Sequence, residues 1–399
     1  MRRSFTIALI VALFSTSLIA TSNAAVKAGS KCALKGDKKT SGTKTYTCIK
    51  SGGKLIWNKG TNNKVVAKPK AEPSVQPTPE PSEIAEVEPT APTEEITFAN
   101  LADNYSGVSY WAWKKSAEKI AKSQPSDTKI TVLIGPNTVP INKKPADAVA
   151  LASRMYADYQ QSSEFVLIYY NYKDIAWAEK YVTQYIGTDG GYDTSGEVKK
   201  MCPSESNCNA AAAMLNQKTI IGVTIITSSD KMKNDPNFTS GTLEAHEYSH
   251  TIQKKQFVGR MPFNRQPPRW LTEGGAEFIQ TASVHYKSFS KYQNDRERVT
   301  KDLYYAHTFN NRWLNDFLNP TTIGINWENW NKYDGWRVYD VGFMVSEILV
   351  AIAGPNSIME IYKLMGDGLT YQEAFAKVFG VTWDAGLATI TKVLANEIG

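Results

Sequence analysis

The pattern of hydrophobic and polar residues differs between the two halves of the chain. The first half has short runs typical of β-strands, and the second half has longer stretches with the spacing typical of helices. β-branched and aromatic runs bounded by turn residues predict strands at 129–134, 165–170 and 220–227. Apolar residues spaced three and four apart predict helices at 145–161 and 174–185, and this spacing continues from residue 242 to the C-terminus. Together these elements predict an α+β fold for residues 97–399.

Two segments of different composition precede this globular part. Residues 25–60 are rich in Gly, Lys and Thr, with β-prone pieces at 44–49 and 54–57, and they predict a small β module. A module of this length buries too little surface to be stable alone, so we expect a Cys32–Cys48 disulfide, worth about 3 kcal/mol, to stabilise it. Residues 61–96 contain seven prolines among Glu, Lys, Ala and Thr, which predicts an extended linker.

The first 24 residues have the pattern of a secretory signal peptide. Arg2 and Arg3 precede an apolar stretch at 5–20, and the small residues that follow offer a cleavage site after Ala24. This stretch is short for a hydrocarbon layer about 30 Å thick, although an uncleaved N-terminal anchor is the alternative. No later segment has 18 consecutive apolar residues, so we expect no further membrane span and a secreted protein.

The spacing of the cysteines indicates the compartment of the protein, and the distribution of charge restricts the classes of partner. In an oxidising compartment the two local cysteine pairs, Cys32 with Cys48 and Cys202 with Cys208, predict two disulfides. The net charge of +6 is concentrated in residues 25–60, with nine Lys and one Asp, whereas residues 97–399 are net neutral. A neutral main part argues against a nucleic-acid partner. The basic module has two interpretations, adhesion to an anionic cell-wall polymer or a solvated spacer.

The candidate chemistry begins with a His-Glu-x-x-His sequence at 246–250. Thr239 and Ser240 can cap a helix there, and residues four apart share one helix face, so His246 and His250 can point at one metal ion. Glu247 would lie beside the ion, where it can take a proton from a water that the metal acidifies. The alternative is a helix with two surface histidines and a solvated glutamate. A catalytic zinc has three protein ligands and an open position, so a further ligand is needed.

A second motif, Trp-Leu-Thr-Glu-Gly at 270–274, lies some twenty residues downstream. A helix that starts after Pro267 and Pro268 would place Glu273 in its first turns, within reach of the first helix. The two motifs together resemble the gluzincin zinc metallopeptidases, and within them the aminopeptidase branch. The resemblance implies a two-lobed unit, with a small mixed β-sheet lobe, a mainly helical lobe and one zinc ion in the cleft between them. It makes His246, His250 and Glu273 the zinc ligands and Glu247 the general base.

Two further residues belong to this candidate site. Glu277, one helical turn after Glu273, is the rival third ligand, and we instead expect it to orient a ligand histidine from behind. Tyr339 begins a Tyr-x-x-Gly segment, which in the aminopeptidase branch supplies a phenol to the oxyanion of the tetrahedral intermediate. By resemblance Tyr339 takes that role, and the alternative is an ordinary packing tyrosine.

One departure from the aminopeptidase branch changes the expected activity. That branch has a Gly-x-Met-Glu-Asn element whose carboxylate holds the free amino terminus of the substrate, and residues 128–240 contain none. Internal cleavage is therefore favoured over aminopeptidase action, and we expect the strand at 220–227 to pair with an extended substrate.

The sequence thus predicts a secreted zinc-dependent endopeptidase that acts on polypeptides. One alternative is a secreted, cell-wall-associated binding protein in which the zinc site is structural. Another is a zinc hydrolase that acts on a cross-link peptide of the cell wall. The walls of a substrate pocket come from residues far apart in the chain, so the sequence leaves this choice open.

Overall fold

The chain divides into two compact units, Met1–Glu83 and Ile84–Gly399. The structure, a computed structural model, describes residues 27–41, 44–62, 90–187, 194–258, 267–306, 309–319 and 334–399. The predicted signal peptide and most of the predicted linker lie outside the described residues. The boundary between the units falls within the predicted linker, but Ile96, which was assigned to that linker, is buried in the core of the second unit.

The first unit contains a small antiparallel sheet. Its strands are β1 (Lys38–Ser41), β2 (Lys44–Ser51), β3 (Lys54–Trp57) and β4 (Thr61–Asn62). β2 is central and pairs with the other three. The predicted disulfide joins Cys32 to Cys48, and Cys48 and Trp57 form the buried centre of this unit. The bridge is thus one of few interactions that can hold so small a sheet together.

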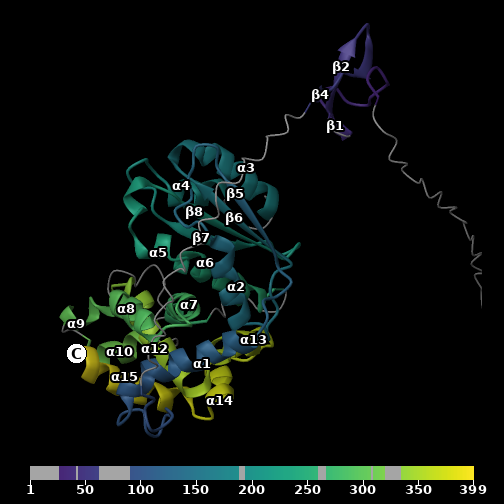
Figure 1. Cartoon of the computed structure of the whole chain (residues 1–399). Coiled ribbons are helices and arrows are strands. Elements are labelled where there is room, and N and C mark those ends of the chain that lie inside the picture. The colour runs from purple at the N-terminus through teal and green to yellow at the C-terminus, as the bar shows by residue number, and fades with distance from the viewer. Residues whose placement is uncertain are drawn as a thin grey trace, which may run out of the picture. The chain divides into compact units, whose positions relative to one another are not determined.

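The second unit combines one sheet with many helices (Figure 1). Its strands are β5 (Lys129–Ile134), β6 (Glu164–Tyr170), β7 (Ala211–Leu215) and β8 (Ile221–Thr227). The helices in the first half are α1 (Val108–Lys122), α2 (Pro145–Met155), α3 (Ile175–Ile186), α4 (Thr194–Met201) and α5 (Pro236–Thr239). Those in the second half are α6 (Thr242–Lys255), α7 (Arg269–Val284), α8 (Phe289–Thr300), α9 (Leu303–Ala306), α10 (Asn311–Leu318), α12 (Arg337–Ala353), α13 (Asn356–Gly366), α14 (Tyr371–Phe379) and α15 (Trp383–Ile398).

The sheet of the second unit is mixed and has the order β5-β6-β8-β7. β5, β6 and β8 are parallel, and β7 runs antiparallel to β8. Successive β6 side chains point to opposite faces, so Val166 and Ile168 pack toward α3 and α4, whereas Phe165 packs against Tyr248 of α6. Helices α3 and α4 cover one face, and α2 and α6 cover the other (Figure 1). Both faces of the central strands β6 and β8 are therefore buried, as is usual for parallel strands, whereas β5 at one edge is half-buried or exposed along its length.

The edge of this sheet differs from the prediction. The strand predicted at 220–227 lies between β6 and β7, so it cannot pair with a substrate, and that expectation is wrong. The two edge strands are β5 and β7, and the sequence of β7, Ala-Ala-Ala-Met-Leu, lacks the β-branched residues that signal a strand. β8 also begins one residue later than predicted, because Ile220 has a positive φ of 59° in the turn that connects β7 to β8.

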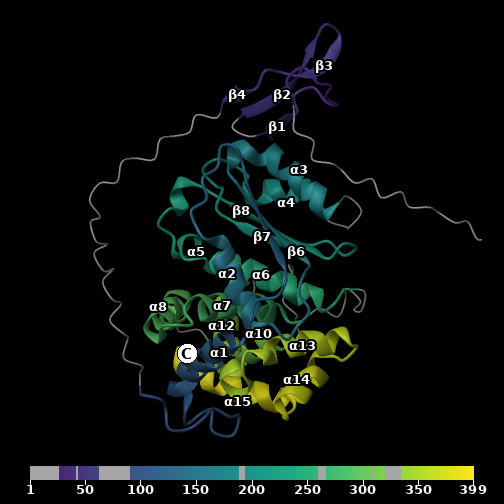
Figure 2. The same cartoon turned by 45° about the vertical axis from the view of Figure 1, so that its right-hand side comes forward.

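Helix α7 lies between α6 and α12 in the helical part (Figure 2). The crossing of α7 and α12 is close because two glycines meet there. A Cβ atom at Gly274 would overlap the backbone of Gly342, and a Cβ atom at Gly342 would overlap the carbonyl oxygen of Trp270. This contact sets the position of the two segments that carry Glu273 and Tyr339.

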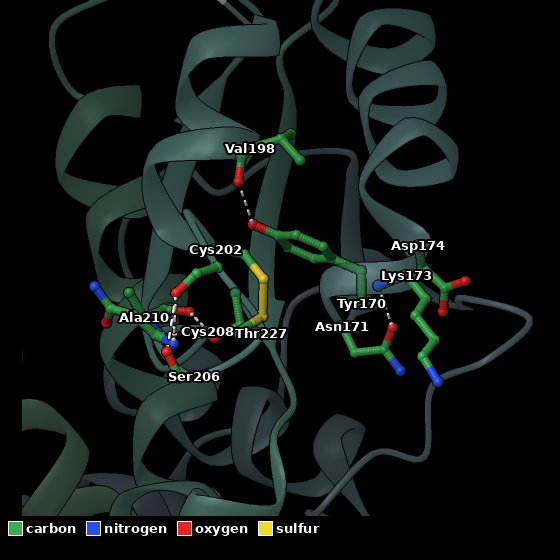
Figure 3. Close-up of a disulfide and its surroundings, with 12 residues drawn as sticks. Tyr170, Asn171, Lys173, Asp174, Val198, Cys202, Ser206, Cys208, Ala210 and Thr227 are labelled. Carbon is green, nitrogen blue, oxygen red and sulfur yellow. Dashed lines mark hydrogen bonds between the residues drawn. A yellow bond between two sulfur atoms is a disulfide. The ribbon is translucent and has the colours of Figure 1, made fainter.

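The second predicted disulfide joins Cys202, after α4, to Cys208, ahead of β7 (Figure 3). Tyr170 lies beside it and donates a hydrogen bond of 2.8 Å from its hydroxyl to the carbonyl oxygen of Val198. Two disulfides fit an oxidising compartment. Among the described residues no single helix is long and apolar enough to cross a membrane, and only the bent pairs α12–α13 and α14–α15 reach such a length when joined.

Candidate metal centre

Helix α6 carries the His-Glu-x-x-His sequence and is buried on nearly all sides, from Thr242 to Gln253. Its N-cap is Gly241, whose φ of 92° is left-handed, so the predicted cap by Thr239 and Ser240 is wrong. A Cβ atom at Gly241 would also lie only 2.7 Å from the Cβ atom of Ala148, which leaves room for glycine alone. Ser240 still contributes, because its Oγ accepts a hydrogen bond of 3.2 Å from the backbone N–H of Thr242.

The structure brings the two histidines and Glu273 together at one point. His246 Nε2 lies 3.1 Å from His250 Nε2, and Glu273 Oε2 lies 3.7 Å from the first nitrogen and 3.3 Å from the second. A tetrahedral ion bound at about 2.0–2.1 Å requires its ligand atoms to be about 3.3–3.4 Å apart. The three atoms are therefore spaced like three corners of a tetrahedron of ligand atoms around one metal ion. Within the described part of the chain, His246, His250 and Glu273 form a group that could hold such an ion.

The outer nitrogens of the two imidazoles also face hydrogen-bond acceptors. His250 Nδ1 lies 2.9 Å from Gln253 Oε1, and His246 Nδ1 lies 3.4 Å from Glu277 Oε1, slightly too far for a good hydrogen bond. With the protons on both Nδ1 atoms, the two Nε2 lone pairs and the Glu273 carboxylate point at one another. Three converging acceptors in a buried place repel each other unless a cation lies between them. The residues present therefore fit a metal ion.

Buried charge shifts the pKa values at this point. Burial alone would lower the pKa of His246, but the hydrogen bond to Glu273 and the charges of Glu277 and Glu247 outweigh it and raise that pKa to about 9. Burial would raise the pKa of Glu273, yet the neighbouring His250 and His246 hold it well below its ordinary value. The pocket therefore favours a positive charge between the ligands, which a proton or a metal ion can supply.

Glu247 and Tyr339 lie close to the group of His246, His250 and Glu273. Glu247 is buried and close enough to influence the pKa values of His246 and Tyr339. The Tyr339 ring stacks on the His246 ring, with the centroids 6.2 Å apart and the planes 26° apart. Burial, and then the charge of Glu273, raise the pKa of Tyr339, so its phenol stays protonated and can donate a hydrogen bond.

Glu277 lies behind the ligands and away from the converging atoms. Burial raises its pKa, and His246 and Arg298 only partly offset this effect. Its second oxygen accepts a hydrogen bond of 2.7 Å from the side-chain amide of Gln280. Glu273 rather than Glu277 is thus the carboxylate that completes the group with the histidines.

Three residues near the site were not found from the sequence. Gln253 supports His250, and its amide group donates a hydrogen bond of 3.1 Å to the Thr272 carbonyl oxygen, which ties α6 to α7. Its position three residues after His250 is the signal that could have been read. Trp336 stacks on Tyr339 at 5.9 Å and is 65% exposed, so it forms the outer end of an aromatic stack.

The third such residue is Lys254, on α6. Its ammonium group donates a hydrogen bond of 2.6 Å to the carbonyl oxygen of Ala213, on β7. Burial lowers the pKa of Lys254, although Glu247 and Glu273 act against this shift. The residue connects the metal-ligand helix to the edge strand of the sheet.

No protein-family model, curated protein or solved structure matches this chain. The arrangement of the side chains therefore carries the functional interpretation by itself.

Proposed function

We propose that this chain is a secreted zinc-dependent peptidase that cleaves peptide bonds inside polypeptides. The convergence of His246 Nε2, His250 Nε2 and Glu273 Oε2 within 3.1–3.7 Å of one another carries the proposal. Two imidazoles and one carboxylate with a fourth position left open are the ligand set of catalytic zinc sites in several peptidases. The unit would then have the two-lobed gluzincin arrangement, with the sheet-containing and helical parts on either side of the metal.

The side chains around the ligands have the groups that peptide hydrolysis needs. When bound, zinc supplies a Lewis acid that polarises the scissile carbonyl and acidifies water. Glu247 takes the proton of the attacking water and passes it to the leaving amine. The protonated phenol of Tyr339 donates a hydrogen bond to the carbonyl oxygen as negative charge develops on it. Glu277 and Gln253 hold the two imidazoles in the tautomer that leaves Nε2 free for the metal.

The substrate would lie along the outer side of β7. This strand is the sheet edge next to α6, and an edge strand can pair with an extended peptide. The chain lacks the Gly-x-Met-Glu-Asn element that would hold a free amino terminus, so a peptide can extend past the site in both directions. Internal cleavage is therefore favoured over removal of single amino-terminal residues.

The test compares two glutamate-to-glutamine variants on the same helix. Glu247→Gln removes the proposed base, whereas Glu244→Gln changes a buried carboxylate that instead accepts a hydrogen bond from Tyr169. Unfolded casein is incubated with the parent and both variants, with and without a chelator. Zinc content is measured in parallel, and the new termini are mapped by mass spectrometry.

We expect chelator-sensitive internal cleavage by the parent and by Glu244→Gln. Glu247→Gln should keep its zinc and lose about 10²–10⁴-fold in rate, the contribution of a positioned base. Equal rates for the parent and Glu247→Gln would refute the mechanism. Bound zinc without cleavage of casein or wall peptides by the parent would instead support a binding protein with a structural metal.

The first unit would determine where the enzyme acts. Its described β-strands and their flanks carry a strong excess of lysine, which suits an anionic cell-wall polymer. In this proposal a signal peptide directs the chain out of the cell, and the module retains it at the wall.

A further inference from the structure

The loops that follow the three parallel strands of the second unit enclose a separate cleft of about 820 Å³. These loops follow β5, β6 and β8, and their residues line it together with Glu205 and Cys208. Its lining includes none of the metal-centre residues described above. In open α/β sheets, ligands commonly bind beyond the carboxyl ends of the strands. The size is within the range of pockets that hold small organic ligands.

The walls of this cleft are held in place by buried hydrogen bonds. Asp174 is only 2% exposed and accepts hydrogen bonds from the Asn137 backbone N–H at 3.0 Å and the Thr138 hydroxyl at 2.5 Å. A Cβ atom at Gly135 would overlap the Asp174 carboxylate, so the glycine is needed for this contact. The hydroxyl of Ser228 donates a hydrogen bond of 2.7 Å to the carbonyl oxygen of Val139. The loops after β5, β6 and β8 are thus tied to one another, and the cleft is preformed.

Positive charge gathers in this cleft although residues 97–399 as a whole are net neutral. Four lysines line it, Lys143, Lys173, Lys231 and Lys233, against two carboxylates, Glu205 and Asp230. Lys233 is paired with Asp230 at 2.8 Å. Among the residues that the structure describes, the other three lysines form no ion pair, although Lys143 and Lys231 each donate one hydrogen bond to a backbone carbonyl. Lys173 extends from the turn after Tyr170 (Figure 3).

Two further features of the lining indicate a ligand. The hydroxyl oxygen of Ser229 is buried and has no hydrogen-bond partner within the described part of the chain. Tyr172 and Val139 are 44% and 71% exposed, so the cleft also offers apolar surface next to its ammonium groups. Ammonium groups without an ion-pair partner on three loops, a hydroxyl without a hydrogen-bond partner in the described part of the chain, and an aromatic ring suit an anionic group carried on a small organic body.

We infer that this cleft is a second binding site, for a phosphate group carried on an organic ligand. Lysine ammonium groups are common phosphate ligands, and several on different loops can contact the oxygens of one phosphate. The phosphate could belong to a soluble monomer or to a phosphodiester polymer, and both present the same group to the lysines. The site is independent of the metal centre, so it would hold the chain on such a ligand whether or not peptide cleavage is the activity.

The test uses the full chain with three probes: inorganic phosphate, glycerol 3-phosphate and poly(glycerol phosphate). Binding is measured by calorimetry for the parent and for the double variant Lys173→Gln/Lys231→Gln. The matched control is Lys122→Gln/Lys392→Gln, which removes the same charge from exposed lysines outside the cleft. All four positions are exposed, so the variants should fold, and circular dichroism checks this.

We expect the cleft variant to weaken binding at least tenfold, and the control variant to bind like the parent. Tighter binding of the polymer than of glycerol 3-phosphate would identify a phosphodiester chain as the ligand, and the reverse order would identify a soluble monomer. The inference is overturned if the parent binds none of the probes at millimolar concentration, or if both variants lose affinity equally. Peptide cleavage, measured on the same samples, should be unchanged by the cleft variant, so failure here is distinguishable from failure of the proposed peptidase activity.

Discussion

Replacing Gly274 by alanine tests how the crossing of α7 and α12 positions the metal centre. The added Cβ atom would overlap backbone atoms of Gly342 and Phe343, which cannot rotate away as a side chain could. Overpacking of this kind costs about 1–3 kcal/mol, and we take about 3 kcal/mol because backbone must move. Alanine in a helix interior recovers about 1 kcal/mol relative to glycine. The net loss of stability should be about 2 kcal/mol.

The neighbouring glycine provides the control. A Cβ atom at Gly275 would meet Ile358 Cγ2 at 3.5 Å and nothing closer, which is ordinary van der Waals contact. Gly275→Ala should therefore be neutral or more stable by up to about 1 kcal/mol.

Thermal and urea unfolding of both variants measure the difference. About 2 kcal/mol corresponds to a drop in Tm of about 3 °C for a unit as large as Ile84–Gly399, since the entropy of unfolding grows with chain length. Glu273 precedes Gly274 and Tyr339 lies one helical turn before Gly342, so separation of the helices also moves a ligand and the phenol. A displacement of about 1 Å can cost 10²-fold in rate, and kcat/KM for peptide cleavage should fall by about that factor. If Gly274→Ala were as stable and as active as Gly275→Ala, the close approach of α7 and α12 at Gly274 would not be what positions Glu273 and Tyr339.

Three further predictions concern the metal centre. Tyr339→Phe should lower kcat for peptide cleavage about 10²–10³-fold with zinc content unchanged, because an oxyanion donor is lost, whereas Tyr159→Phe, outside the site, should leave kcat unchanged. In the metal-free chain the pKa of His246 is raised from 6.5 to about 9. Protonation of His246 therefore contributes fully to the free energy of unfolding below pH 6.5, and this contribution is lost as pH rises through about 9. Urea unfolding should show a loss on the order of 3 kcal/mol over that window in chelator-treated protein and little loss in zinc-loaded protein, where the metal replaces the proton. Glu277→Gln should weaken zinc affinity about 10–100-fold in competition with a chromophoric chelator, and unchanged affinity would exclude the orienting role.

Much of the fold was predicted from the sequence, namely the parts whose signal lies in neighbouring residues. β5 has the predicted bounds, because its β-branched residues lie between clear turn signals. Both disulfides join the cysteines that are nearest in the sequence. The group of His246, His250 and Glu273 was also predicted, since the spacing within α6 and the start of α7 after Pro268 determine which side chains can meet.

Features that depend on tertiary contacts were missed or wrong. β7 is a strand because β8 supplies its hydrogen bonds, and its alanines give no propensity of their own. Gly342 ends the Tyr-x-x-Gly motif, which was interpreted as part of the catalytic site. Its physical role in the structure is to let α12 approach Gly274. The lysine-lined cleft joins loops some ninety residues apart, which only the strand order brings together.

X-ray absorption at the zinc edge, with metal counting on single variants of the three ligands, measures whether these side chains bind zinc. We expect about one zinc per chain, bound by two imidazole nitrogens and a carboxylate oxygen at about 2.0–2.2 Å. His246→Ala, His250→Ala and Glu273→Ala should each lose most of that metal. A spectrum without imidazole ligands, or full zinc binding by all three variants, would show that His246, His250 and Glu273 are not the ligands of a zinc ion.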